Sequence, residues 1–103
     1  MSVIVVATVH PAPEHRSEVI AAFIDAINAV HTHDHGCELY ALHENDDRLV
    51  MIEKWASADA LEVHSAGDAL KELTQRIDGK IIGRLDVQVL RPHPAGTPQQ
   101  GSL

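Results

Sequence analysis

The sequence has little cysteine, few aromatic residues and few positive charges, and each shortage excludes a kind of function. Its one cysteine, Cys37, has no partner for a disulfide within the chain, so nothing indicates an oxidising compartment. Eight Lys and Arg against 15 Asp and Glu give a formal net charge of −7. Phosphate backbones and anionic membranes need clustered cations, which are missing. Phe23, Tyr40 and Trp55 are the only aromatic residues, too few for stacking on bases. We therefore expect neither nucleic acid nor membrane as a partner.

The sequence also lacks a hydrophobic run long enough to span a bilayer. The apolar stretch VIVVATV at residues 3–9 is short and β-branched, which predicts a strand. It has neither the basic segment nor the cleavage site of a signal peptide. We expect a cytoplasmic protein.

The 103 residues, 45% of them hydrophobic, are enough for one domain. The spacing of apolar residues predicts strand, helix, strand, strand, helix and strand at residues 3–9, 13–35, 37–43, 49–55, 57–79 and 82–90. We expect Gly36 to end the first helix, Ser57 to begin the second and Gly67 to interrupt it. Residues 93–103 are rich in Pro, Gly and Gln with little to bury, which predicts a disordered C-terminal tail after a domain of residues 1–92.

This order is typical of the ferredoxin-like βαββαβ arrangement, an α+β fold in which an antiparallel sheet carries its helices on one face. Helices on one side can cover only one face of the sheet, yet the first three predicted strands are apolar on both faces. Ile4 and Val5, for example, point to opposite sides. An open face of this kind would favour aggregation. We therefore expect a homodimer in which two sheets pack face to face.

Five segments, taken in order, suggest a family. They are VIVVATVHPAPEHRSEVIAAF, GCELYALHEND, IEKW, ALEVHSAG and DVQVLRP, between Val3 and about Pro92. Together they resemble the antibiotic biosynthesis monooxygenase family of dimeric α+β barrels. The resemblance implies a homodimeric barrel and a monooxygenase without metal, flavin or haem cofactor. Some relatives break down haem with an asparagine in the first strand and a late histidine. This chain has Ala7 or Thr8 and Thr74 there, which disfavours haem breakdown.

The stretch HTHDHGC at residues 31–37 raises the question of a metal site. On a helix, His31 and His35 share a face at a spacing that suits two ligands, and a third would come from Asp34, His43 or a partner chain. The alternative is a polar helix end, where imidazole lies well against the negative end of the helix dipole. Because metal sites usually have tighter ligand sets, we favour the helix end and expect no metal.

His64 and Tyr40 are the candidate catalytic residues. His64 follows Leu61 by three positions and shares the inward stripe of its helix; this pattern alone favours a structural histidine. The resemblance reverses that balance, because relatives often have a histidine beside the pocket, and imidazole suits a general base. Tyr40 is expected in the same cavity as a hydrogen-bond partner for the substrate, with a core or interface aromatic as the alternative.

Four further residues are expected to bind substrate. Phe23 lies on the inward stripe of the first helix, Trp55 ends the third strand, His43 closes the second strand at the rim, and Arg84 could hold a phenolate or carboxylate. Core packing competes with this role for Trp55, and surface pairing competes for Arg84. Glu53 is interpreted as a paired structural carboxylate.

The resemblance implies that a small aromatic substrate, a hydroquinone or an anthrone, is oxidised by dioxygen to a quinone. A deprotonated substrate of this kind reduces dioxygen directly, so the protein needs only an apolar cavity, a base and hydrogen-bond donors. Two alternatives stay open: an isomerase of a small oxygenated metabolite, with His64 moving a proton, and a ligand-binding or stress-related dimer without turnover. The sequence does not identify the substrate.

Overall fold

The computed structural model describes all 103 residues, and its elements follow the expected order. They are β1 (Val3–Pro11), the 3-10 helix η1 (Pro13–His15), α1 (Arg16–His33), β2 (Cys37–Glu44), β3 (Leu49–Trp55), α2 (Ala58–Ser65), α3 (Asp68–Ile77) and β4 (Ile81–Leu90). The second helical region is two helices divided at Gly67, as its sequence predicts. Ser57 caps α2, because its side chain accepts a hydrogen bond from the backbone N–H of Ala60.

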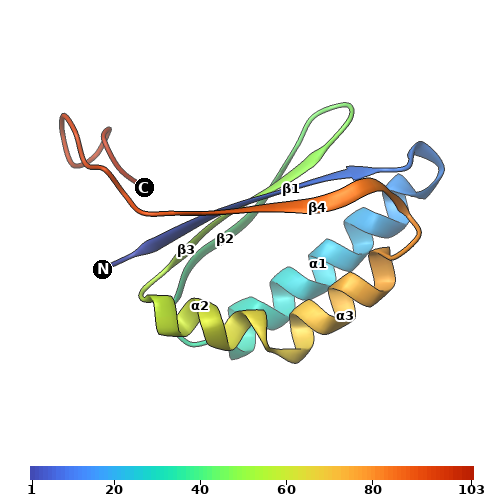
Figure 1. Ribbon diagram of the computed structural model, residues 1–103, viewed down its shortest axis with the longest axis horizontal. Coiled ribbons are helices and arrows are strands. Elements are labelled where there is room, and N and C mark those ends of the chain that lie inside the picture. Colours follow the sequence, from blue (N-terminus) through green and yellow to red (C-terminus); the bar gives the residue numbers. More distant parts are fainter.

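The four strands form one antiparallel sheet in the order β2-β3-β1-β4. All helices lie on the same face of this sheet (Figure 1). β1 and β3 are therefore central, while β2 and β4 are edge strands. The arrangement is the ferredoxin-like α+β fold, and the fold prediction is confirmed. None of the helices combines the length and the hydropathy that a membrane crossing requires.

The core lies between the sheet and the helices. Side chains alternate along β3, so that Leu49, Met51, Glu53 and Trp55 face the helices and are buried, while Val50, Ile52 and Lys54 point the other way and are half-buried. From α1, Phe23 and Val30 pack against this face in the same apolar cluster. Each large side chain buried there contributes about 1.5–3 kcal/mol. Trp55, with no exposed surface, is the largest of them.

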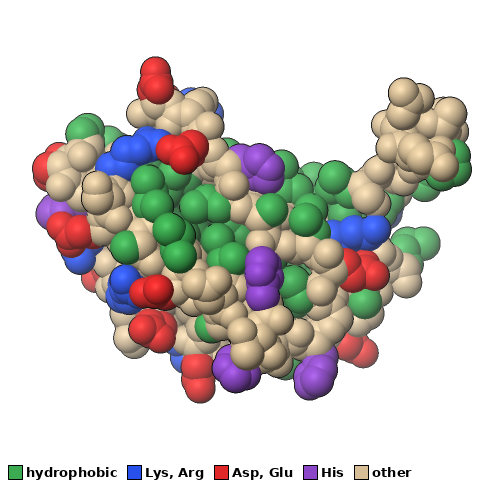
Figure 2. Space-filling model, turned by 180° about the vertical axis from the view of Figure 1, so that it is seen from behind, with side chains coloured by type: hydrophobic (Ala, Val, Ile, Leu, Met, Phe, Trp, Pro, Cys, Tyr) green, Lys and Arg blue, Asp and Glu red, His purple; other side chains and the backbone are tan.

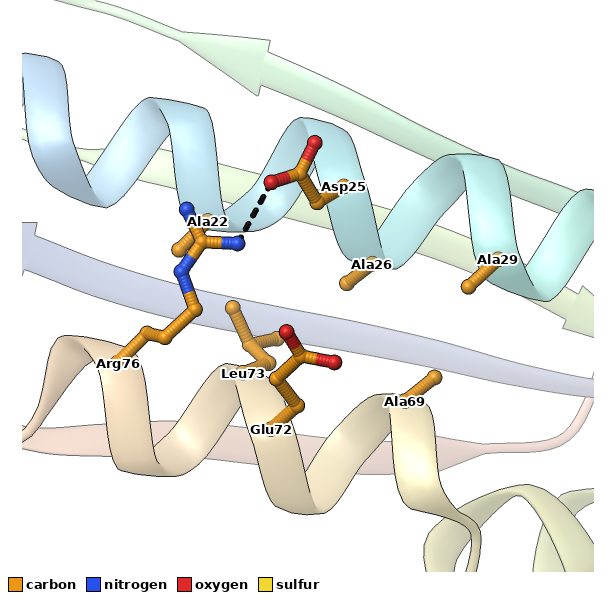
Figure 3. A pocket seen from close by; sticks show the side chains of 8 residues that line it. All are labelled: Ala22, Asp25, Ala26, Ala29, Ala69, Glu72, Leu73 and Arg76. Carbon is orange, nitrogen blue, oxygen red and sulfur yellow. Dashed lines mark hydrogen bonds and ion pairs between the residues drawn. The ribbon is translucent and has the colours of Figure 1, made fainter.

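Helices α1 and α3 lie side by side and approach closely because small residues line their contact (Figure 3). Ala26 and Ala29 of α1 face Ala69 of α3. At the rim, Arg76 Nη1 donates to Asp25 Oδ2 at 2.6 Å. An exposed pair of this kind contributes little to stability. The space left between the helices is about 20 Å³, so this is a packing seam and not a ligand site.

The connection from α1 to β2 is short and brings the end of α1 against α2. The helix ends at His33, Asp34 is extended, and Gly36 has a φ of 77°, in the left-handed region that favours glycine. A Cβ atom on Gly36 would lie 2.7 Å from the Cβ of Ala60 in α2. Only glycine allows this approach, which places Asp34 beside His64.

No helix covers the other face of the sheet. Ala41, Ile52 and Val6 form a row across three strands on this face and are half-buried within one chain. At one end of the face, Lys54 Nζ donates to the backbone oxygen of Leu103 at 2.8 Å, so the C-terminal residues fold back onto the strands. Seen from behind, the molecule also gathers hydrophobic side chains in the middle of its surface (Figure 2).

Candidate active site

A cavity of about 100 Å³ lies between the sheet and the helices. Its lining is mostly apolar and comes from all four strands and all three α-helices, including Val5, Phe23, Met51 and Leu73. Ligand sites of proteins are commonly apolar spaces in which a few polar groups fix the orientation of the ligand. This cavity is therefore the candidate binding site, and its polar side chains are the candidate chemical groups.

Three ionisable side chains line the cavity. Tyr40 and Glu53 are direct neighbours on β2 and β3, and His64 comes from α2. The exposed fractions of these three residues are only 4%, 5% and 5%. Titratable groups held together in a buried apolar space are typical of functional sites, because a structural core gains little from them.

His64 is held by a carboxylate from another element. Its Nδ1 lies 2.8 Å from Oδ2 of Asp34, which follows the end of α1. A carboxylate can only accept, so Nδ1 carries the hydrogen and the other nitrogen, Nε2, has a free lone pair. Every fully buried side-chain nitrogen or oxygen atom has a hydrogen-bond partner. Nε2 of His64 has no partner within the chain, so it cannot be fully buried. Nε2 therefore reaches open space and is available to take a proton.

Two aromatic rings hold the imidazole in place. The ring centroid of Trp55 lies 4.4 Å from that of His64 at an interplanar angle of 31°. Tyr40 lies edge-on to the imidazole, with centroids 5.2 Å apart and an angle of 71°. Together with the hydrogen bond that His64 donates to Asp34, these contacts leave the imidazole one orientation. Such preorganisation is what a general base requires.

The pKa values of the other two groups are both raised. Burial raises the pKa of the Tyr40 hydroxyl, and the nearby Glu53 and Asp34 charges add to the effect. The phenol therefore stays neutral and acts as a donor. Burial also raises the pKa of Glu53, partly offset by the hydrogen bond from Trp55 and by the proximity of His64. The Tyr40 hydroxyl has no partner in the chain, so by the same reasoning it is not fully buried. Because Tyr40 lines the cavity, its hydroxyl is available there.

A second, more open groove of about 380 Å³ lies on the other side of His64. Its lining includes His33, Asp34, His35 and Asp59, and His64 belongs to both spaces. Asp34 lines this groove and not the cavity. The Asp34–His64 pair therefore lies between the cavity and this more open groove.

The histidine stretch at residues 31–35 has a different role from the cavity. Nε2 of His31 lies 3.0 Å from the backbone oxygen of Tyr40, so this side chain ties the end of α1 to the edge strand β2. No group of three or more His, Cys, Asp or Glu side chains is arranged to hold a metal ion. The stretch lies at the polar end of a helix, and its Asp34 is the residue that contacts His64.

The structure brings some of the sequence-predicted residues together and leaves others apart. His64, Tyr40 and Phe23 line the cavity, and Trp55 lies behind His64 against its ring. His43 and Arg84 are exposed and do not line the cavity.

Asp34 and Glu53 were missed as members of the site. The sequence indicates Asp34 only as an alternative metal ligand and Glu53 only as a structural carboxylate. The one signal for Glu53 is its position in the alternation of β3, where a carboxylate occupies an inward position between Met51 and Trp55.

The fold and the cavity define a class: a small ferredoxin-like α+β protein with an apolar site for a small molecule. A model of the antibiotic biosynthesis monooxygenase family matches residues 2–76, which is most of the chain. The chain belongs to the antibiotic biosynthesis monooxygenase family, and the resemblance seen in its sequence is confirmed. None of the curated proteins matches it.

Solved structures agree with this assignment. A Caulobacter crescentus protein that bears the same family name has 26% identity and a TM-score of 0.82, over 86% of this chain and 87% of that one. A Mycobacterium tuberculosis protein has 25% identity and a TM-score of 0.86, over 94% and 100%. A conserved Methanosarcina mazei protein at 22% identity, with a TM-score of 0.82 over 88% and 92%, shows the same fold. The family and these relatives support a monooxygenase or a related function acting on a small molecule.

Proposed function

We propose that the protein is a cofactor-independent monooxygenase that oxidises an electron-rich aromatic compound to a quinone with dioxygen. The observation that carries this proposal is the Asp34–His64 pair, because His64 lines the mostly apolar cavity and its Nε2 has no partner in the chain. Such a site supplies what the reaction needs: a base, a hydrogen-bond donor and mostly apolar surroundings.

His64 acts as the base in this proposal. Its Nε2 takes a proton from the substrate, and the carboxylate of Asp34 stabilises the imidazolium that forms. The Tyr40 hydroxyl donates a hydrogen bond to the substrate oxygen on which negative charge develops. Because the pKa of Tyr40 is raised, its proton stays available for this bond. The deprotonated substrate then passes electrons to dioxygen.

The electrons and atoms balance in two ways. In an anthrone, a ring CH2 loses a proton, the carbanion combines with dioxygen, and the resulting hydroperoxide loses water to leave a C=O group. One oxygen atom enters the product and the other leaves in water. In a hydroquinone, two protons and two electrons pass to dioxygen, giving the quinone and hydrogen peroxide; no oxygen atom enters the product, so on this substrate the same site acts as an oxidase. Isotope-labelled dioxygen distinguishes these routes, since only the first labels the quinone.

The size of the cavity favours the smaller substrate. About 100 Å³ is little beside the ~300–1,000 Å³ of typical ligand sites. One or two fused rings suit this space better than the three rings of an anthrone. A quinol is therefore the first substrate class to test.

The test replaces the base and measures oxygen consumption. With quinols under air, we expect His64→Ala to lower kcat by ~10²–10⁴-fold, as for loss of a general base. His43→Ala is the matched control, because His43 is exposed and outside the cavity. Circular dichroism checks that both variants are folded. Equal quinone formation in wild type and His64→Ala would remove His64 from the mechanism, and none in either would remove the function.

An isomerase is the second candidate. The observation that favours it is the presence of two groups that can hold protons, His64 and Glu53, in one cavity. Two such groups could take a proton from one carbon and return it to another. The same oxygen electrode separates the candidates, because an isomerase converts its substrate without consuming oxygen.

A further inference from the structure

Glu53 is a buried carboxyl group that the proposed mechanism leaves unused. It lies on the central strand β3, in register between Val5 of β1 and Tyr40 of β2, and faces the helices. Its exposed fraction is 5%, and it lines the cavity. A carboxyl group in such surroundings is costly unless its oxygens have partners. The partners of its two oxygens therefore indicate its role.

The chain supplies a partner for only one oxygen. Oε1 accepts a hydrogen bond from Nε1 of Trp55 at 2.9 Å. Oε2 has no partner in the chain, whereas every fully buried side-chain oxygen has one, so Oε2 is not fully buried. Oε2 therefore reaches open space, and the space that Glu53 lines is the cavity. Holding Trp55 explains Oε1 but does not explain a second oxygen turned toward the binding site.

We infer that Glu53 determines specificity: its free oxygen accepts a hydrogen bond from a second hydroxyl group of the substrate. The inference rests on the proposed function, which places the first hydroxyl group at His64. A ring with two hydroxyl groups satisfies both residues. A ring with one hydroxyl group, or with the second one methylated, leaves a buried carboxyl oxygen desolvated and without a partner. The cavity therefore favours dihydroxy aromatic compounds over their methyl ethers.

The experiment measures binding without turnover. Trp55 is the only tryptophan, and it contacts both Glu53 and His64, so its fluorescence reports on the site. Under nitrogen, the full chain is titrated with hydroquinone, resorcinol and catechol, each paired with its monomethyl ether. In wild type, we expect at least one diol to bind about tenfold or more tightly than its own ether. The isomer with the largest ratio of diol affinity to ether affinity indicates the spacing of the two hydroxyl groups that the site prefers.

The variant Glu53→Gln tests the residue. Its amide oxygen can still accept from Trp55, while its NH2 group turns a donor toward the ligand, so the diol-to-ether preference should fall to one or below. Glu62→Gln, the same change at an exposed residue of α2, should keep the wild-type ratio. An unchanged ratio in Glu53→Gln would overturn the inference. Equal affinities within every pair in wild type, or no binding of any diol, would overturn it without any variant.

These outcomes are separate from those of the proposed function. Diol preference in the absence of oxygen, together with no oxygen consumption under air, would keep the role of Glu53 and remove the monooxygenase. Oxygen consumption under air, with equal affinities for diol and ether, would keep the monooxygenase and remove the role of Glu53.

Discussion

At the residue scale, the site depends on one hydrogen bond between groups 30 positions apart. Asp34 fixes which nitrogen of His64 carries the hydrogen, and this decides whether the imidazole can accept a proton from the cavity. The rings of Trp55 and Tyr40 fix its orientation but not its tautomer. Asp34 is therefore a positioning residue, and its removal should affect catalysis more than substrate binding.

We predict that Asp34→Asn lowers kcat by about 10²-fold or more with little change in KM. The Asn amide NH2 can donate to Nδ1, which moves the hydrogen to Nε2 and removes the base. Asp59→Asn is the control, because Asp59 lines the same groove without contacting His64. Steady-state kinetics with a quinol measures both variants. Wild-type kcat in Asp34→Asn would show that the hydrogen bond has no catalytic role.

Glu53 should also make stability depend on pH. Its pKa in the folded state is raised above the ordinary value of 4.5 by burial, so the folded protein holds a proton that the unfolded chain has lost. The free energy of unfolding should therefore fall as pH rises from about 4.5 to the raised pKa. Tyr40 and His64 are the titratable groups that face Glu53.

Glu53→Gln should lack this fall in stability. Urea unfolding at a series of pH values, followed by Trp55 fluorescence, should show the variant gaining stability relative to wild type across that range. The difference should then stay constant at higher pH. Parallel curves for the two proteins would mean that Glu53 ionises as freely in the fold as in the unfolded chain.

At the element scale, the turn after α1 decides where Asp34 lies. Gly36 combines a φ of 77° with a Cβ direction that points at Ala60 of α2. Gly79, in the turn after α3, has nearly the same φ, 76°, but nothing lies within 4 Å of its Cβ position. The two glycines therefore separate the cost of backbone conformation from the cost of a steric contact.

We predict that Gly79→Ala lowers the free energy of unfolding by about 1–2 kcal/mol, the cost of a left-handed alanine. Gly36→Ala should cost roughly 1–3 kcal/mol more, because its methyl group would force α1 and α2 apart. Gly36→Ala should also lose activity, since Asp34 would move away from His64. Urea unfolding and quinol kinetics measure these effects. Equal losses in the free energy of unfolding in both variants would mean that α2 moves to accommodate the methyl group on residue 36 without an energetic cost.

At the scale of the whole molecule, the open face of the sheet favours a homodimer. The row of Ala41, Ile52 and Val6 would lie against its copy if two sheets packed face to face. Apolar sheet faces in stable proteins are usually covered, and the helices of one chain cover only one face here (Figure 1). We propose that the protein forms a homodimer closed in this way.

We predict a dimer at micromolar concentration in sedimentation velocity. Ile52→Lys should shift it to monomer, because a two-fold axis would place two buried lysines near each other without partners. Ile24→Lys is the control: Ile24 lies on α1, away from the sheet face, with 48% of its surface already exposed. A monomeric wild type would remove the dimer from the proposal, and a dimeric Ile52→Lys would place the interface elsewhere.

Much of the fold could be predicted from the sequence, because local signals agree with the tertiary structure. The third strand at Leu49–Trp55, the cap at Ser57 and the break at Gly67 all have their expected positions. His64 could be placed in the interior from its spacing to Leu61. The roles of Asp34 and Glu53 could not, because each depends on a partner that local spacing does not specify.

The sequence by itself determined the order of the elements, which follows from the spacing of apolar residues, and it indicated the family through short motifs. Only the tertiary structure decided which polar groups meet. Asp34 reaches His64 because a left-handed glycine brings two helices together, and Glu53 joins Tyr40 through strand register. Chemistry at a site depends on distances of about 3 Å, and distances this short between remote residues arise only when the chain is packed.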